Sequence, residues 1–306
     1  MNKKSVVNPD NWGVSFSIKQ CRNFNQNPKE TLAWLIEKGF RRFRLMSYWD
    51  ELEKAQAEQD FSQLDWQIDL VEKAGGVITL CLGARQPRWP ENHWPDWAWA
   101  ASFQERSDAL GDFITQVVQR YKNRSCIVSY QLENEALLES FGLRSEVSRS
   151  RLRAEYALVH SLDPDRPIIM TTSTSWGIPI RRPRPKILGF SVYNIVFDSS
   201  KQSYGGTEQS PLIYRLRALL YKLTTFGRRK SFIHELQCEP WGPRAIWEMD
   251  HNEQDRSMNT KQIRRNIHIA KLMRLYPIDL WGGEWWRQRE LEGDPKVIDD
   301  ILKLVN

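Results

Sequence analysis

Strand-like and helix-like hydrophobic patterns alternate along almost the whole chain, and this alternation limits the possible folds more than any other feature. A chain in which strands are followed by helices forms parallel strands, because each helix carries the chain back across the sheet. Eight segments have the short, apolar character of buried strands: 12–17, 41–49, 77–83, 127–135, 168–175, 187–194, 230–237 and 278–286. Seven further segments space their apolar residues as helices do: 29–39, 64–74, 103–122, 146–161, 212–225, 260–276 and 295–305.

Eight such strands in 306 residues favour a closed (β/α)8 barrel over an open doubly wound sheet. Such a barrel takes about 250 residues, and no glycine-rich phosphate-binding turn follows the first strand, as a dinucleotide-binding sheet would require. We therefore predict an α/β fold with a single TIM-barrel domain over residues 1–306. The stretch between Ser175 and Ile187 is short and contains prolines, so the fifth helix is expected to be short or missing.

The charge and cysteine content argue against several classes of protein. The net charge is +6, but the basic residues are scattered, with modest clusters at 181–186 and 228–230, so we expect no nucleic-acid partner. The N-terminus has no apolar signal segment and no stretch is apolar enough to span a bilayer, which predicts a cytoplasmic protein without a membrane span. The four cysteines are widely spaced, and we expect no disulfide, no metal site and no cofactor.

Polar side chains gather where the predicted strands end, and in a (β/α)8 barrel the reactive residues lie at those ends. The fourth strand ends in Asn134 and Glu135, and the seventh ends in His234 and Glu235. The two glutamates would then lie on opposite sides of the barrel mouth. The other strand ends contribute Arg44, Tyr48, Arg85, Gln86, Tyr193, Glu284 and Trp285.

Cleavage of a glycosidic bond needs such a pair of carboxyl groups. One protonates the departing oxygen, and the other attacks the sugar or activates water. A nearby arginine and tyrosine would keep the attacking carboxylate ionised, while a less polar setting would raise the pKa of the acid. The fourteen tryptophans offer flat faces on which sugars can stack.

Several motifs resemble the clan A glycoside hydrolases, the cellulase-like retaining barrels. The segment QLENEAL closes the fourth strand with Asn-Glu, and IHELQCEPWG places a glutamate at the end of the seventh. FRLMSYWDELE, LDPDRPI, RQPRWPENH and LWGGEWW resemble a bacterial subgroup of cellulase-family glycosyl hydrolases. The resemblance follows the strand order over nearly the whole chain.

This resemblance implies a role for each matching residue. Glu135 would be the acid/base and Glu235 the nucleophile, with Asn134 binding the sugar hydroxyl next to the reacting carbon. Arg44 and Tyr193 would support Glu235, and Trp285 would form a sugar platform. The departures from the family pattern concern the substrate more than the reaction: Ser191 stands for a histidine, Leu236 and Gln237 for an aromatic residue and glycine, and Arg85-Gln86 for a histidine.

Other residues keep more than one interpretation. Glu133 is expected to be structural, because strand alternation points it away from Asn134. Glu239 lies beyond the strand, where a loop position is favoured over the nucleophile role, and His234 is expected to be a buried histidine with its bonds satisfied. Glu284 either binds a sugar hydroxyl or pairs with Arg85 or Arg287. Candidate sugar contacts are Gln86 and at least one of Trp89, Trp94, Trp97 and Trp99.

Together these features predict a retaining β-glycosidase that acts on an oligo- or polysaccharide. Two alternatives remain open at this point. The first is a carbohydrate-binding barrel that has lost catalysis, and the second is a basic barrel that associates with an anionic polymer. The oligomeric state, the sugar and the linkage do not follow from the sequence.

Overall fold

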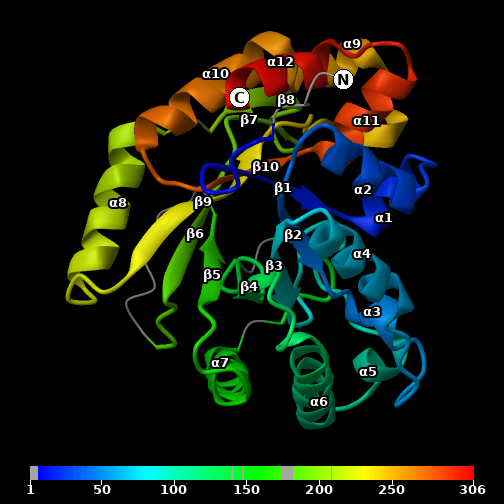
Figure 1. Cartoon of the computed structure of the whole chain (residues 1–306), viewed down its shortest axis with the longest axis vertical. Coiled ribbons are helices and arrows are strands. Elements are labelled where there is room, and N and C mark those ends of the chain that lie inside the picture. Colours follow the sequence, from blue (N-terminus) through cyan, green and yellow to red (C-terminus); the bar gives the residue numbers. More distant parts are fainter. Residues whose placement is uncertain (1–5, 139–140, 147, 174–181, 208) are drawn as a thin grey trace.

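Eight parallel strands close into a barrel, which confirms the predicted (β/α)8 fold (Figure 1). The computed structural model describes residues 6–138, 141–146, 148–173, 182–207 and 209–306. Around the barrel the strands follow the order β1-β10-β9-β6-β5-β4-β3-β2, so successive barrel strands pair and the last meets the first. They are β1 (Trp12–Phe16), β2 (Arg42–Met46), β3 (Val77–Leu82), β4 (Ile127–Leu132), β5 (Ile168–Thr172), β6 (Ile187–Val192), β9 (Lys230–Gln237) and β10 (Ile278–Trp281).

The barrel strands are buried on both sides, because helices cover the outside and side chains fill the interior. All five residues of β1 are buried, and so are five of the six residues of β3. The interior is not wholly apolar, however. Ser15, Arg44, Thr79 and Ser129 pair in register on four neighbouring strands, so a charged side chain lies inside the barrel. A buried arginine of this kind needs partners.

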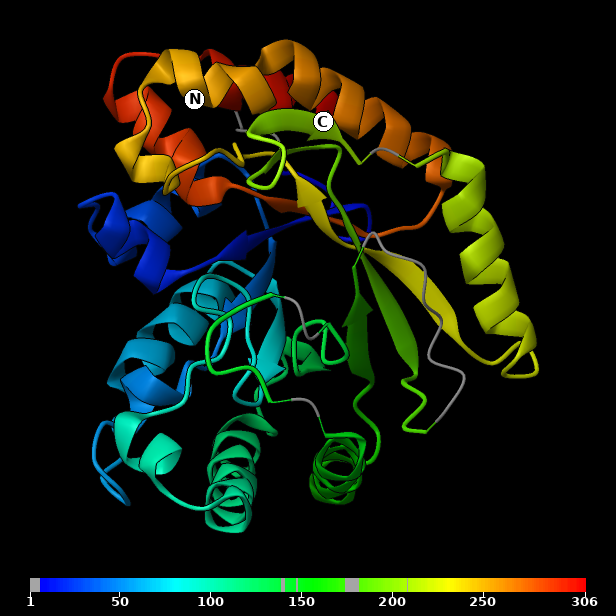
Figure 2. The ribbon, with the colours of Figure 1, turned by 180° about the vertical axis from the view of Figure 1, so that it is seen from behind.

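All seven predicted helices are present, and Figures 1 and 2 show them around the outside of the barrel. Local sequence signals explain where several begin: Asn27 caps the second helix just before a proline, and Ser102 with Glu105 forms a capping box. The seven helices are α2 (Pro28–Glu37), α4 (Ser62–Lys73), α6 (Phe103–Tyr121), α7 (Arg149–Leu162), α8 (Pro211–Leu223), α10 (Thr260–Met273) and α12 (Lys296–Val305).

The predicted end of the last strand is wrong. β10 stops at Trp281, and the residues after it form a helix, α11 (Gly283–Leu291). Gly282 makes the sharp turn between them with a φ of 139°, a conformation that only glycine adopts easily. Glu284 and Trp285 therefore belong to the first turn of a helix and not to a strand end.

Several short elements add to the basic barrel. The antiparallel hairpin of β7 (Ile195–Asp198) and β8 (Ser203–Gly206) follows β6. The remaining helices are α1 (Ile18–Asn23), α3 (Trp49–Leu52), α5 (Asp96–Ala100), α9 (His251–Ser257) and the 3-10 helix Ile246–Glu248. Most of the segment that would hold the fifth helix, residues 174–181, lies outside the described residues, so its absence stays a prediction. Within the described ranges, no helix combines the length and the apolar character that crossing a membrane requires.

Candidate active site

Glu235 lies near the end of β9, and two side chains hold its carboxylate. Nη1 of Arg44 donates to Oε2 at 2.8 Å, and the hydroxyl of Tyr193, just beyond β6, donates to Oε1. Burial and the charge of Glu235 raise the pKa of Tyr193, so its phenol stays protonated and remains a donor. Arg44 is fully buried on β2. The structure thus brings together the three residues that the sequence assigned to the nucleophile and its support.

Asn134 is held in one orientation by a network around its side chain. Its Oδ1 accepts from Nη2 of Arg44 at 2.9 Å, from Nε2 of Gln131 at 3.1 Å and from the Thr171 hydroxyl at 3.1 Å. Its Nδ2 donates to Oε2 of Glu91 at 3.0 Å. An amide group carries two N–H donors. These contacts leave one N–H of Asn134 for a substrate hydroxyl.

Glu135 lies half-buried directly after Asn134, at the end of β4. Its backbone N–H donates to the hydroxyl of Thr171 at 2.7 Å, which fixes the turn that follows the strand. Burial and the negative charge of Glu235 raise the pKa of the Glu135 carboxyl from 4.5 to about 7, against the opposing charges of Arg85 and Arg44. A carboxylic acid with this pKa holds its proton near neutral pH and can release it to a leaving group.

The backbone on both sides of Asn134 is strained. Glu133 and Glu135 have φ angles of 44° and 43°, in the left-handed region that side-chain-bearing residues rarely adopt. Such residues cost about 1–3 kcal/mol each and cluster at functional sites. Glu133 offsets part of this cost, because its carboxylate accepts from the backbone N–H groups of Ala84 and Arg85 at 3.0 and 2.7 Å. This is the structural position expected for Glu133.

Glu91 is a third carboxyl group near the pair, and sequence reasoning missed it. It lies on the loop after β3, is 6% exposed and contacts Asn134 as described above. Burial raises its pKa to about 8, and the charges of Glu235 and Glu135 add to the rise. No strand-end pattern marks this residue, because the loop after β3 folds back over the mouth before it places Glu91 there.

A second charged cluster forms around Arg88, which lies on the loop after β3. Arg88 donates to both carboxylate oxygens of Glu239 and, through Nη2, to Oε2 of Glu284 at 2.8 Å. Its guanidinium group also stacks on the ring of Trp281, 3.9 Å from the centroid. Glu284 is fully buried, and its Oε1 accepts from the backbone N–H of Ser17 at 2.6 Å. The predicted partners of Glu284, Arg85 and Arg287, are therefore wrong, and its burial excludes the alternative role as a sugar contact.

Two other predicted sugar contacts are also wrong. Trp285 is fully buried, and its indole N–H donates to Gln254 at 2.8 Å, so it cannot form a platform. The tryptophan at the end of the last barrel strand is Trp281. Gln86 is fully buried as well, and its Nε2 donates to the backbone oxygens of Ser47 and Gly83 at 2.8 Å each.

Trp89 differs from these residues, because 55% of it is exposed. It begins a chain of ring contacts that runs from Trp89 to Phe141, on to Trp241 and then to Tyr193, with centroid separations of 6.0, 5.5 and 5.4 Å. Trp94 is nearly fully buried, and Trp97 and Trp99 are partly buried beside it. Trp89 is thus the one of the four loop tryptophans with a largely free surface.

Two other polar residues near the mouth, His234 and Gln237, have structural partners. His234 is fully buried and its Nδ1 lies 2.5 Å from Oδ2 of Asp279, but its Nε2 has no hydrogen-bond partner among the described residues, so the expectation of satisfied bonds holds for one ring nitrogen only. Gln237, a departure from the family pattern, accepts from the backbone N–H groups of Asn194 and Ile195 at 2.8 and 3.1 Å. It thereby fixes the chain just after Tyr193. Ser191, another departure, pairs in register with Glu235.

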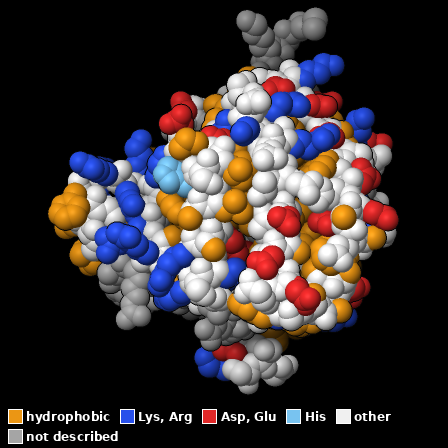
Figure 3. All heavy atoms as spheres, turned by 90° about the horizontal axis from the view of Figure 1, so that it is seen from below, with side chains coloured by type: hydrophobic (Ala, Val, Ile, Leu, Met, Phe, Trp, Pro, Cys, Tyr) orange, Lys and Arg blue, Asp and Glu red, His pale blue; other side chains and the backbone are white. Residues whose placement is uncertain are grey.

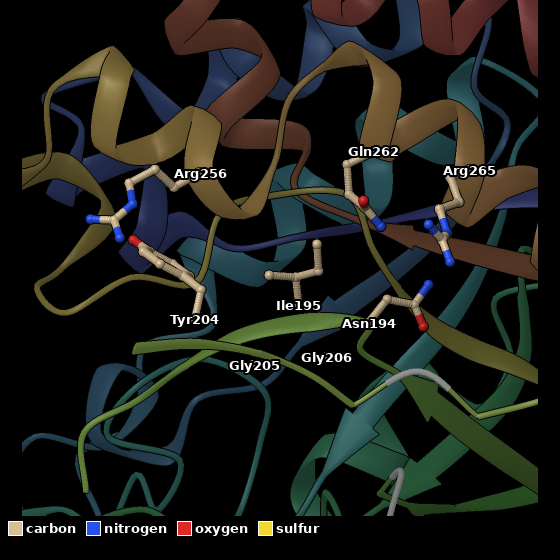
Figure 4. Close-up of a pocket in the computed structure, with 8 residues that line it drawn as sticks. All are labelled: Asn194, Ile195, Tyr204, Gly205, Gly206, Arg256, Gln262 and Arg265. Atoms are coloured by element: carbon tan, nitrogen blue, oxygen red, sulfur yellow. The ribbon is translucent and has the colours of Figure 1, made fainter. Parts of the chain in front are cut away.

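A hollow of about 290 Å³ lies outside this cluster, between the β7–β8 hairpin and helices α9 and α10 (Figure 4). Arg256 stacks over the ring of Tyr204 at one end, and Arg265 lies at the other. None of Glu91, Glu135 and Glu235 lines it. Across the described part of the chain, no group of three or more His, Cys, Asp or Glu side chains could hold a metal ion.

Comparison with solved structures shows that the barrel resembles glycoside hydrolases. A GH5_18 enzyme from Streptomyces cattleya, solved with GlcNAc, has a TM-score of 0.63 and 12% identity over 89% of this chain and 70% of its own. An endo-β-1,4-xylanase of family 10 from Gloeophyllum trabeum has a TM-score of 0.63 and 11% identity over 98% and 97%. An exo-β-1,4-mannosidase from an Opitutaceae bacterium, strain TAV5, has a TM-score of 0.60 and 13% identity, with 97% of this chain covering 59% of that enzyme.

No protein-family model matches the sequence, and no curated protein sequence matches it. The structural matches alone confirm, at the level of the fold, the likeness to glycoside hydrolase barrels that the motifs predicted. Because the sequence identities are only 11–13%, the proposed chemistry has to rest on the side chains of the site itself.

Proposed function

We propose that this protein is a retaining β-glycosidase, with Glu235 as nucleophile and Glu135 as acid/base. One observation carries the proposal: two carboxyl groups lie at one barrel mouth in different surroundings. Arg44 and Tyr193 both donate hydrogen bonds to the carboxylate of Glu235. Glu135, by contrast, has a pKa raised to about 7 by burial and by the charge of Glu235. Retaining glycosidases need this division of roles between two carboxyl groups.

In the first step a carboxylate oxygen of Glu235 attacks the anomeric carbon, and a covalent ester bond forms there. The bond between that carbon and the leaving oxygen breaks, and Glu135 gives its proton to this oxygen. The sugar is then attached to Glu235, and Glu135 is a carboxylate.

In the second step Glu135 removes a proton from water, and the water oxygen attacks the same carbon. The ester bond to Glu235 breaks and its carboxylate returns. This reversal of roles is favourable because the ester carries no negative charge, so one cause of the raised pKa of Glu135 disappears while the sugar is attached.

Asn134 supports both steps through its free N–H group, which can donate to the hydroxyl next to the reacting carbon. Hydrogen bonds to that hydroxyl strengthen in the transition state. We propose a β-linked oligosaccharide as the substrate class. The likeness to β-1,4-xylanase and β-1,4-mannosidase barrels and the exposed face of Trp89 support this choice.

The test compares the wild type with Glu235→Gln on aryl β-glycosides and on β-linked glucans, mannans and xylans. We expect turnover in the wild type, with retention of the anomeric configuration by proton NMR, and loss of nearly all turnover in the variant. Glu58→Gln, at an exposed glutamate on the loop between α3 and α4, is the matched control and should keep full activity.

An activated 2-fluoro sugar should then label the wild type on a single peptide that contains Glu235. A label on another carboxyl group, or full activity of Glu235→Gln, would refute the assignment. Sugar binding without turnover and without any label would instead favour the carbohydrate-binding barrel.

A further inference from the structure

Helix α8 packs on the barrel with its polarity inverted. The side chains that it buries are Tyr214, Arg217 and Tyr221, and Arg217 lies against the rings of Phe190 and Tyr214, 4.9 and 5.5 Å from their centroids. A surface helix of a globular protein normally turns its apolar stripe toward the core. Here polar and aromatic residues take that place, and leucines point to the outside.

The outward side of α8 and of the turn after it carries large exposed apolar residues. We call this surface the α8 leucine face; its members, with their exposed fractions, are Leu212 (68%), Leu216 (48%), Leu219 (52%), Leu220 (39%), Leu223 (63%) and Phe226 (93%). Ten other large apolar residues are exposed in the whole described part of the chain, so this short segment holds a disproportionate share. Exposed apolar surface gathered in this way marks an interaction site.

The Lys and Arg residues of the segment that carries the α8 leucine face are not balanced by any acidic residue within it. No aspartate or glutamate occurs in residues 209–234, and the exposed cations there include Arg215, Lys222, Arg228 and Lys230. The other basic cluster of the sequence lies beside it. The hydroxyl of Tyr221 donates to the backbone oxygen of Pro185 at 2.6 Å. The backbone N–H of Lys230 donates to the backbone oxygen of Lys186 at 3.4 Å.

The neighbouring elements extend this positive border. Helix α10, which packs beside α8, lies within residues 256–278, a stretch that also has no acidic residue. On the other side, Nζ of Lys186 donates to the backbone oxygen of Asp165 at 3.5 Å. Figure 3 shows lysine and arginine side chains gathered around apolar ones at one edge of the molecule, and Figures 1 and 2 place α8 at the outer edge of the barrel.

We propose that the α8 leucine face and its basic border bind the surface of an anionic lipid bilayer. Helices with apolar residues on one face and Lys or Arg beside them lie in the plane of the interface, with the apolar side chains among the acyl chains. The cations then reach the negatively charged headgroups. An anionic bilayer therefore matches both properties of this surface: its acyl chains accept the leucines, and its headgroups attract the cations.

A second copy of the chain is a poorer partner for this surface. The spacing of Leu212, Leu216, Leu219, Leu223 and Phe226 alternates between four and three residues, which suits helix pairing. Pairing two copies, however, would bring Arg215 and Lys222 of each helix together, and residues 209–234 supply no acid to neutralise them.

Binding at this surface leaves the barrel mouth open. The α8 leucine face lies on the outside of the barrel and reaches the amino end of β9 at Phe226 and Lys230, whereas Glu235 lies near the carboxyl end of that strand (Figure 1). The full chain bound to vesicles should therefore still meet a soluble substrate.

The experiment measures cosedimentation of the full chain with phosphatidylcholine vesicles and with vesicles of equal parts phosphatidylcholine and phosphatidylglycerol. We expect binding to the anionic vesicles only, weakened by salt. The double variant Leu219→Ser/Leu223→Ser should bind at least about tenfold more weakly, and Arg228→Gln/Lys230→Gln about tenfold more weakly. Leu291→Ser and Lys303→Gln, at exposed positions outside the patch, are the matched controls.

Circular dichroism and the hydrolysis of a soluble glycoside should be the same in all variants, so failure of the membrane proposal is distinguishable from failure of the glycosidase proposal. Binding that is equal in wild type and leucine variant, or absent for anionic vesicles, would overturn the proposal. So would a concentration-dependent dimer that the leucine variant loses, because it would identify a second copy as the partner.

Discussion

Replacing Glu235 by glutamine should lower the pKa of Glu135. The negative charge of Glu235 is, after burial, the main cause that raises the pKa of Glu135 from 4.5 to about 7. Glutamine keeps the shape of the side chain and removes the charge. Arg44 remains in place, and its positive charge, no longer neutralised by a carboxylate, also favours the ionised form of Glu135.

The size of the effect follows from the charges. Two carboxylates at the retaining separation of about 5.5 Å, in a medium with an effective dielectric constant of about 20, repel each other by about 3 kcal/mol, or about two pH units. Arg44, 2.8 Å from Glu235, cancels part of this repulsion. Burial is the larger cause of the whole rise and stays in the variant. We therefore expect the pKa of Glu135 to fall by about one unit.

The assay is a titration of side-chain carboxyl signals by carbon NMR in protein labelled at glutamate. Loss of one signal in Glu135→Gln assigns Glu135, and the assigned signal is then followed in Glu235→Gln. Glu58→Gln should leave its midpoint unchanged. An unchanged or higher pKa of Glu135 in Glu235→Gln would refute the reasoning, because the two carboxyl groups would then not interact at the mouth.

Three further expectations follow from the same network. Arg44→Leu leaves the carboxylate of Glu235 buried without its cation and should lower the free energy of unfolding by about 3–5 kcal/mol in denaturant titrations. The control Arg22→Leu breaks an exposed ion pair with Glu51 and should lower the free energy of unfolding by less than about 1 kcal/mol. Equal losses in the two variants would contradict the role of burial. Tyr193→Phe removes one donor to Glu235 and should lower kcat by about 10- to 100-fold, with the fold unchanged by circular dichroism; an unchanged kcat would show that the hydroxyl does not support the nucleophile. The pKa of Glu91 is raised from 4.5 to about 8, chiefly by burial, so the folded state keeps this proton while the unfolded state has lost it, and stability falls as the pH rises between these values. Glu91→Gln should therefore flatten the decline of Tm over about pH 5–8, and parallel slopes for variant and wild type would count against it.

The barrel could be predicted because its signals are local. Each barrel strand is a short apolar run between helical segments, and a parallel arrangement then places all strand ends at one mouth. Asn134, Glu135 and Glu235 were found in this way, since each stands at a strand end in a sequence context that needs no knowledge of the loops. The role of Arg44 beside Glu235 came from the family resemblance, and the cost of burying an unpaired charge explains why this buried arginine needs such a partner.

The run LWGGEWW shows where such reasoning fails. Its apolar residues suit either a strand or a buried helix, and periodicity alone does not distinguish the two in so short a run. Gly282 turns the chain, so that Trp281 stays at the barrel end while Trp285 enters the packing of a helix. Two predicted site residues, Glu284 and Trp285, are fully buried for this single reason.

The sequence by itself determined the barrel, the order of its strands and the two glutamates at their ends, because hydrophobic period and strand-end position are properties of neighbouring residues. Only the tertiary structure decided which side chains surround them. Glu91 and Arg88 come from a loop whose path is set by contacts with distant segments, namely Asn134, Glu239 and Glu284. The pKa of Glu135 likewise depends on burial and on a charge one hundred residues away in sequence, because electrostatic interactions act through space and not along the chain.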